Sequence, residues 1–164
     1  MVKYTLILVI VVAALIHLRP PAMLAQSVVP AQPAPPPFNP SFGDLMNTLV
    51  QPRHAKLALT AREQNWPLAA YAIHQLKDAL ANIAKWRPRF RNQSVPDMME
   101  ATTGEPIKAI EQAVQARDLR QFNEAFTRLT EGCNSCHEAL NHGYIVIKAP
   151  DQSFFANQDF RVAK

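Results

Sequence analysis

Cysteine and glycine are both scarce in this chain. Its 164 residues include only two cysteines, Cys133 and Cys136, and a disulfide between residues so close in sequence would close almost no loop. A small fold held together by a disulfide framework is therefore excluded. The chain has four glycines against fourteen prolines. So few glycines disfavour a fold rich in tight turns, where glycine supplies the unusual backbone angles.

A strong charge of either sign is also lacking. The formal net charge is +4, from 17 Lys and Arg and 13 Asp and Glu. If an N-terminal segment carrying Lys3 and Arg19 is removed, 15 Lys and Arg remain and the net charge falls to +2. Nucleic-acid-binding domains usually carry a marked positive charge, so the net charge gives no reason to expect a nucleic-acid partner.

No apolar run reaches the length of a comfortable transmembrane helix, but a shorter one stands at the N-terminus. Lys3 is followed by the unbroken apolar stretch Thr5–Ile16, whereas a helix needs about 20 residues to cross a bilayer. A positive start, a short apolar run and a small residue such as Ala25 are typical of an export signal. We expect residues 1–25 to direct the chain to a bacterial periplasm, either cleaved or kept as an inner-membrane anchor.

Proline is concentrated just after this segment. Residues 26–40 contain six prolines, and proline has no backbone N–H and disrupts helices and central strands. We therefore predict an extended linker over residues 26–40. The folded domain, with its C-terminal tail, is expected to span residues 41–164.

From Ser41 onward the apolar residues recur every three or four positions, which predicts helices. The first predicted helix is capped by Ser41, and Pro52 should kink or restart it. The second starts at Pro67, and a third, short one follows an irregular stretch that ends near Gly104. The residues on one face of the four predicted helices are Phe42, Met46, Leu49, Arg53 and Leu57; Ala69, Ile73, Leu76, Leu80 and Ile83; Ile107, Ile110 and Val114; and Phe122, Phe126, Leu129, Cys133, Cys136 and Leu140. We predict an all-α fold, an antiparallel four-helix bundle, with an irregular C-terminal strap from Tyr144 onward.

Cys133, Cys136 and His137 form the sequence C-x-x-C-H on the fourth predicted helix. Positions i, i+3 and i+4 share one face of a helix, so the three side chains point the same way. Two thiols in this arrangement can add to the two vinyl groups of a haem, while the imidazole reaches the iron from the same side. The motif predicts one covalently bound haem c with His137 as an axial ligand.

Two other uses of paired cysteines fit less well. A thioredoxin-like dithiol lies beside a strand–helix unit, and none is predicted here. A structural zinc site usually needs four ligands, and no second cysteine pair is present. Haem attachment is therefore the preferred interpretation.

With C-x-x-C-H on the last of four helices, residues 41–142 resemble the class II c-type cytochromes, which include cytochrome c′ and its low-spin relatives. The stretches QPRHAKL at Gln51–Leu57 and NQDF at Asn157–Phe160 are also similar to those of a group of small bacterial cytochromes. The resemblance implies a four-helix bundle that holds one haem and is compatible with a dimer. We expect an exported electron carrier rather than an enzyme.

In the resembled class the first helix faces the distal side of the haem. Some members place a methionine there and transfer electrons, whereas cytochromes c′ proper leave the position open and bind nitric oxide or carbon monoxide. Met46 lies where the methionine-ligated members have theirs, so we expect it to be the sixth ligand; its alternative role is an ordinary core residue. His54 is the competing ligand, although on a straight helix it lies about 80° around from Met46.

Arg53 lies two helical turns after Met46 on nearly the same face. It would either contact the haem propionates, since guanidinium pairs well with carboxylates, or reach solvent from the edge of the bundle. Weaker candidates for ligation are His74, His142, Met98 and Met99.

Residues 85–91 (KWRPRFR) combine four cations with two aromatic side chains. This mixture occurs in proteins that bind single-stranded nucleic acid, but in an exported haem protein we expect it to dock an acidic redox partner, or to be a solvated loop.

Three functions are compatible with the sequence, and electron transfer is the one that we expect. The second in rank is a gas-binding haem protein with an open sixth site. The third is peroxidase-like catalysis with His54 as the distal acid–base group.

Overall fold

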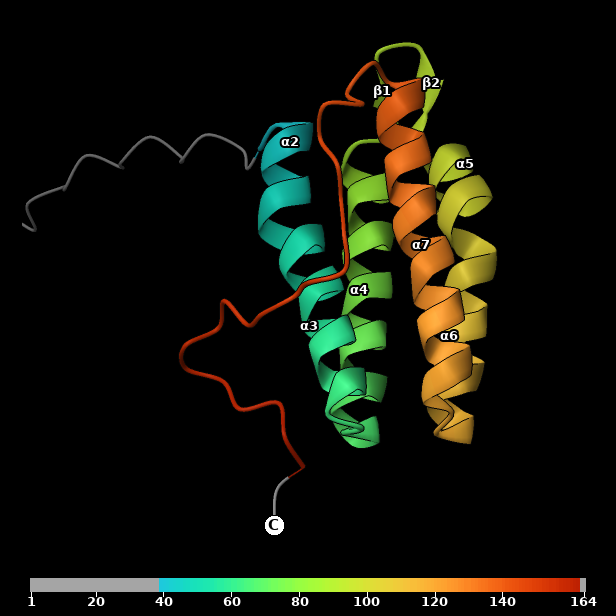
Figure 1. The fold of residues 1–164 in the computed structure, drawn as a ribbon. Helices are drawn as coiled ribbons and strands as arrows, with labels where there is room; N and C mark the ends of the chain where they lie inside the picture. The colour runs from blue at the N-terminus through green and yellow to red at the C-terminus, as the bar shows by residue number, and fades with distance from the viewer. Residues whose placement is uncertain (1–38, 163–164) are drawn as a thin grey trace, which may run out of the picture. The chain divides into compact units, whose positions relative to one another are not determined.

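Helices account for most of the residues that the computed structural model describes, which are residues 39–162 (Figure 1). The predicted export segment, and all but two residues of the predicted linker, lie outside the described residues. The described residues belong to one compact unit. Among them, no helix is both long and apolar enough to cross a membrane. The described residues are all-α apart from one short hairpin.

Residues 39–162 form four helical segments, two of which contain a π-helical turn. In chain order the elements are α2 (Phe42–Leu45), the π-turn η1 (Met46–Val50), α3 (Gln51–Arg62), α4 (Trp66–Trp86), β1 (Arg89–Phe90), β2 (Gln93–Ser94), α5 (Val95–Met99), the π-turn η2 (Glu100–Gly104), α6 (Glu105–Ala116) and α7 (Leu119–Ala139). The two strands pair as an antiparallel hairpin. The basic segment 85–91, expected to be a loop, thus covers the end of α4 and strand β1.

Short polar side chains begin the helices. Ser41 and Asp44 form a reciprocal capping box, in which each side chain accepts a hydrogen bond from the other residue's backbone N–H at 3.1 Å. The predicted cap at Ser41 is therefore confirmed. Asn65 caps α4 and Asp118 caps α7 in the same general way, by accepting a backbone N–H three residues later.

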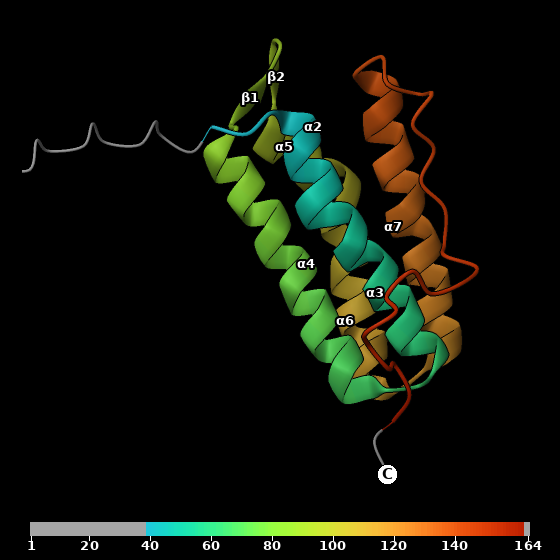
Figure 2. The ribbon, with the colours of Figure 1, turned by 90° about the vertical axis from the view of Figure 1, so that its left-hand side faces the viewer.

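The helices pack side by side, as both views show (Figures 1 and 2). α3 packs against α4, α4 against α6, α6 against α7, and α7 against α3. Their apolar faces meet in one core, whose larger side chains are Leu57, Ile73, Leu76, Ile107, Ile110, Phe122, Phe126 and Leu129. These buried positions are the ones that the helical spacing of the sequence indicated.

The helical chain continues through the region of Pro52 instead of breaking there. The π-turn η1 precedes this proline, and the N–H of Gln51 donates to the carbonyl of Met46, five residues back. A π-turn is wider than an α-turn, so it relieves the clash between a proline ring and the carbonyl four residues earlier. α3 then starts with Pro52 in its first turn, which is one of the two expected outcomes.

The third helical segment begins earlier than predicted. The stretch before Gly104 was expected to be irregular, but it is helical from Val95 onward. Ser94 caps this helix by accepting a hydrogen bond from the N–H of Asp97 at 3.4 Å. The π-turn η2 then leads into α6, which has Pro106 in its first turn, so the two segments accommodate their prolines in the same manner.

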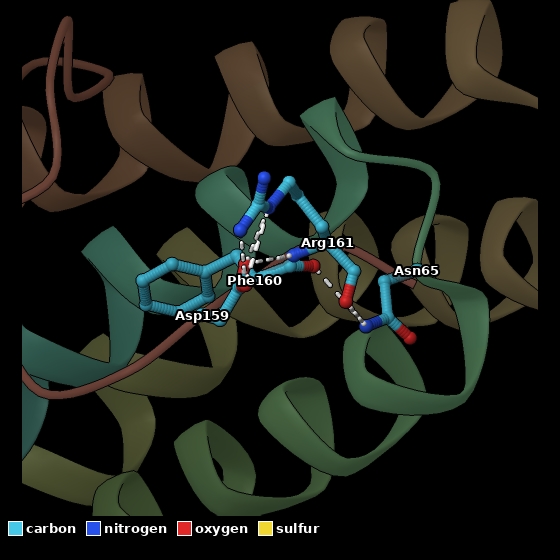
Figure 3. Close-up of polar contacts among 4 residues, drawn as sticks. All are labelled: Asn65, Asp159, Phe160 and Arg161. Carbon is cyan, nitrogen blue, oxygen red and sulfur yellow. Dashed lines mark hydrogen bonds and ion pairs between the residues drawn. The ribbon is translucent and has the colours of Figure 1, made fainter. Parts of the chain in front are cut away.

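Residues 140–162 contain no helix or strand and fold back across the helices as a strap. Phe160 near its end is only 6% exposed. The side-chain amide of Asn65 donates to the carbonyl oxygens of Phe160 and Arg161 at 3.1 and 3.0 Å, as Figure 3 shows. Arg161 also pairs with Asp159 at 2.6 Å. The end of the strap is thereby fixed at the turn between α3 and α4.

Gly132 lets α7 approach η2 more closely than any other residue type would. A Cβ at this position would overlap the carbonyl oxygen of Thr102 and lie 3.0 Å from its carbonyl carbon. Backbone cannot move aside as a flexible side chain can. The glycine therefore fixes the distance between the two segments directly before Cys133.

We expect Gly132→Ala to destabilise the protein by about 2 kcal/mol or more, because the added methyl group must push η2 away from α7. Gly43→Ala is the matched control, since a Cβ there meets only the Ser41 hydroxyl at 3.9 Å. This control should be neutral or stabilising by up to about 1 kcal/mol. Denaturant unfolding followed by far-UV circular dichroism measures both; equal stabilities for the two variants would contradict the packing argument.

Candidate functional site

The C-x-x-C-H residues line a cavity of about 180 Å³ between the first helical segment, α7 and the strap. Its walls are mostly apolar and come from five parts of the chain. The lining residues are Phe42, Met46, Asn47, Val50, Gln51 and His54 from α2 to α3; Leu80 from α4; Met99, Thr102 and Thr103 from α5 and η2; Cys133, Cys136 and His137 from α7; and Leu140, Ile145, Val146 and Ile147 after it. Cys133, Cys136 and His137 thus share one cavity with both candidate sixth ligands, Met46 and His54.

Met46 and His54 both lie on the wall of this cavity. Eight residues on a straight α-helix would separate their directions by about 80°. The π-turn η1 lies between them, and because it takes up one additional residue, the same eight residues complete nearly two turns and the separation falls to about 20°. The structure therefore removes the angular offset that argued against His54 in the sequence.

The same π-turn moves Arg53 away from the cavity. Its predicted position on the face of Met46 assumed a straight helix, and one additional residue rotates it by roughly 100°. Arg53 donates a hydrogen bond from Nη1 to the carbonyl of Leu49 at 2.8 Å and lines a separate cavity that includes Lys56 and Tyr71. Arg53 is therefore not among the residues that line the cavity of Cys133, Cys136 and His137, and its contact with a haem propionate stays a prediction.

His137 is held by the strap. Its Nδ1 lies 2.8 Å from the backbone carbonyl oxygen of Ile145. A carbonyl oxygen can only accept, so Nδ1 carries the proton and, in the neutral ring, Nε2 carries the lone pair. A histidine that binds a metal through one nitrogen commonly donates the other N–H to such an acceptor. The sequence did not identify this acceptor, because it lies in an irregular segment.

Cys133 and Cys136 are free, half-buried thiols. Burial, together with the neighbouring Cys136, raises the pKa of the Cys133 thiol to about 11, and burial also raises the pKa of Cys136. Dithiol oxidoreductases depend instead on a lowered thiol pKa. In the part of the chain that the structure describes, no group of three or more His, Cys, Asp and Glu is placed to hold a metal ion. His142, one of the weaker ligand candidates, donates a hydrogen bond from Nδ1 to the backbone carbonyl of Leu140.

His54 is a buried neutral histidine with a defined hydrogen bond. Only 4% of it is exposed, and its Nε2 lies 3.0 Å from the hydroxyl oxygen of Thr130. That hydroxyl donates its proton to the carbonyl of Phe126 at 2.9 Å, so His54 donates from Nε2 and keeps its lone pair on Nδ1. Burial lowers the pKa of His54 from 6.5 to about 4.

The wall made by Met99, Thr102 and Thr103 has no counterpart in the helices that the sequence predicts, because the pattern indicates an irregular stretch there. One signal could have revealed the helix: Ser94-x-x-Asp97 repeats the pattern of Ser41-x-x-Asp44, a cap followed by an acidic residue three positions later. The contribution of residues 145–147 had no comparable signal, because no local pattern says where an irregular segment returns.

Comparisons with known proteins give no further identification. No protein-family model matches the chain, and neither the curated proteins nor the solved structures that were searched contain a match. The chemistry of the site therefore follows from its own residues. Two neutral thiols, two thioethers, the imidazole of His137 and the neutral imidazole of His54 line one apolar cavity.

We expect the buried His54 to make stability depend on pH between about pH 6.5 and pH 4. In this window the unfolded chain binds a proton that the folded protein excludes, so the free energy of unfolding falls as the pH is lowered and levels off below about pH 4. The loss should amount to about 3 kcal/mol. Denaturant unfolding at several pH values measures it.

His54→Gln is the matched control for this pH dependence, because an amide does not titrate. The variant should lack that part of the pH dependence. If the two proteins lose stability equally on acidification, His54 does not carry the effect.

Proposed function

We propose that this protein is an exported c-type cytochrome that holds one covalently attached haem c and transfers electrons. One observation carries the proposal: Cys133, Cys136 and His137 line the same apolar cavity as Met46. The proton on Nδ1 of His137 is engaged by the carbonyl of Ile145, which leaves Nε2 free to bind iron. If the C-x-x-C-H sequence had arisen by chance, neither a cavity beside it nor an acceptor for the Nδ1 proton of His137 would be required.

The packing of the helices supports the finer description of the fold as an antiparallel four-helix bundle of the cytochrome c′ type. α3 and α4 are joined by three residues, and α6 and α7 by two. Helices joined so tightly run in opposite directions when they pack together. The contacts of α4 with α6 and of α7 with α3 complete a four-sided arrangement.

The residues of the cavity fit the group that the motif implies. Cys133 and Cys136 would hold a haem through thioether bonds, which form when each S–H adds across a vinyl group without any net oxidation. His137 would bind the iron through Nε2. The bound haem would supply an iron that accepts and releases one electron. The apolar walls exclude water from this site, and burial is one of the factors that set the potential of a haem.

Met46 is the proposed sixth ligand, and His54 is the alternative. His54 is fixed in the core, because its Nε2 bonds Thr130 and its ring lies 4.5 Å from the ring of Phe126. Met46 lines the cavity, is only half-buried and has a flexible side chain, so it can turn toward a bound iron without breaking a side-chain hydrogen bond. If neither residue binds the iron, the protein would instead be a gas-binding haem protein with an open sixth position.

The proposed location is the periplasm, and the proposed partners are acidic redox proteins. Among the described residues the structure records no salt bridge for the four cations of residues 85–91. Phe90 in this segment stacks on Phe42 at 4.8 Å between ring centres, and Phe42 lines the cavity. Positive charge beside the haem pocket would speed the encounter with an acidic protein.

Acid–acetone extraction tests the covalent attachment. The colour should stay with the wild-type protein, because thioether bonds survive a treatment that removes haem held only by ligation. The double variant Cys133→Ala/Cys136→Ala should lose its haem to the organic phase. The variant Met46→Ala should keep it and serves as the control. Extraction of the haem from the wild-type protein would sink the proposal.

A visible spectrum of the reduced protein tests the sixth ligand. The wild type should show sharp low-spin α and β bands. Met46→Ala should become high-spin, bind carbon monoxide and have a lower reduction potential, because a thioether favours reduced iron. His54→Gln should do none of these. A reversed result would make His54 the ligand, and a high-spin wild type would favour the gas-binding alternative.

A further inference from the structure

The strap runs back along the last turns of α7, on the side of the candidate haem cavity. After Leu140 the chain reverses, with the N–H of His142 donating to the carbonyl of His137 at 2.7 Å and that of Ile145 to the carbonyl of His142 at 2.8 Å. Residues 145–147 then form part of the cavity wall. The strap therefore forms part of the cavity on the side of α7, where His137 lies.

Asn134 connects α7 to this strap with two hydrogen bonds. Its Oδ1 accepts from the N–H of Ile147 at 2.7 Å, and its Nδ2 donates to the carbonyl of the same residue at 2.9 Å. A carboxamide that pairs with both polar groups of one backbone unit replaces the two bonds that a neighbouring strand would make. Asn134 is thus a two-bond clasp between the helix and the strap.

The strap runs in the opposite direction to α7, so Ile147 lies beside Asn134 and Ile145 lies beside His137. From Asn134 to His137 the helix rises about 4.5 Å, while two residues of extended chain between Ile147 and Ile145 cover about 6.6 Å in the opposite direction. The clasp therefore holds the Ile145 carbonyl beside the imidazole, where it accepts the Nδ1 proton at 2.8 Å. Release of Ile147 would free this carbonyl as well.

Exposure of the strap residues indicates that their backbone, more than their side chains, is held in place. Tyr144 is 78% exposed, Ile145 43% and Val146 72%, so burial of apolar surface does little to keep this stretch against α7. The far end is anchored separately by the buried Phe160 and its bond from Asn65. Near the cavity, the bonds of Asn134 and His137 carry the attachment.

We propose that Asn134, which lies between the two cysteines of the motif, is a positioning residue for His137. By clasping the strap it keeps the Ile145 carbonyl hydrogen-bonded to Nδ1, which fixes the ring orientation and makes Nε2 a stronger donor to iron. The inference rests on the proposed function, because it concerns His137 as an iron ligand. Asn134 occupies one of the two x positions of the C-x-x-C-H motif. The inference gives this position a role that the motif itself does not require.

The test compares Asn134→Ala with Ser135→Ala in the haem-loaded full chain. Ser135 is the other residue between the cysteines and is exposed, so its replacement is the matched control. Asn134→Ala should accelerate hydrogen exchange at the Ile147 amide by roughly tenfold, the equivalent of one lost hydrogen bond. It should also raise the reduction potential, because a less basic Nε2 stabilises oxidised iron less well. Ser135→Ala should match the wild type in both measurements.

Asn134→Leu provides a second variant if the alanine variant does not accumulate. Leucine is similar in size to asparagine but can neither accept from the Ile147 N–H nor donate to its carbonyl, so exchange and potential should change as they do in Asn134→Ala. Unchanged exchange in either variant would overturn the clasp. Faster exchange with an unchanged potential would overturn the positioning role and leave Asn134 a structural residue. Loss of covalent haem from the wild type would instead refute the proposed function, and the exchange measurement would still test the clasp.

Discussion

Proline inside a helix is the constraint on which the candidate site depends. Pro52 cannot donate a backbone hydrogen bond, and its ring would clash in a regular α-turn. The chain responds with the π-turn η1, which keeps the segment helical and takes up one additional residue. This residue rotates everything that follows, so His54 turns toward the cavity of Met46 and Arg53 turns away from it.

The same solution occurs on the opposite wall, where the π-turn η2 precedes Pro106. There the carbonyl of Thr102 lies so close to α7 that only Gly132 fits beside it. Cys133 is the next residue, so the position of the first thiol is coupled to the helix packing at this point. Two π-turns, each shortly before a proline, thus contribute to two sides of one cavity.

The polar groups of the cavity are arranged to stay neutral. Burial lowers the pKa of His54 and raises the pKa of Cys133 and Cys136, so none of the three is charged at neutral pH. The Nδ1 proton of His137 bonds to a carbonyl of the strap. These three groups therefore bring no charge to the apolar cavity, and the strap contributes to its wall as directly as the helices do.

The sequence by itself determined that the chain is helical, that Ser41 begins the first helix, and that Cys133, Cys136 and His137 share a face, because all three conclusions depend on residues within one or two turns of each other. Tertiary structure decided the rest. The direction of His54 and Arg53 depends on a π-turn that a fixed period of 3.6 residues does not reveal. The bond from His137 to Ile145, and the clasp of Asn134 on Ile147, join a helix to an irregular segment. No local spacing encodes such contacts, because they depend on where the chain returns after it leaves α7.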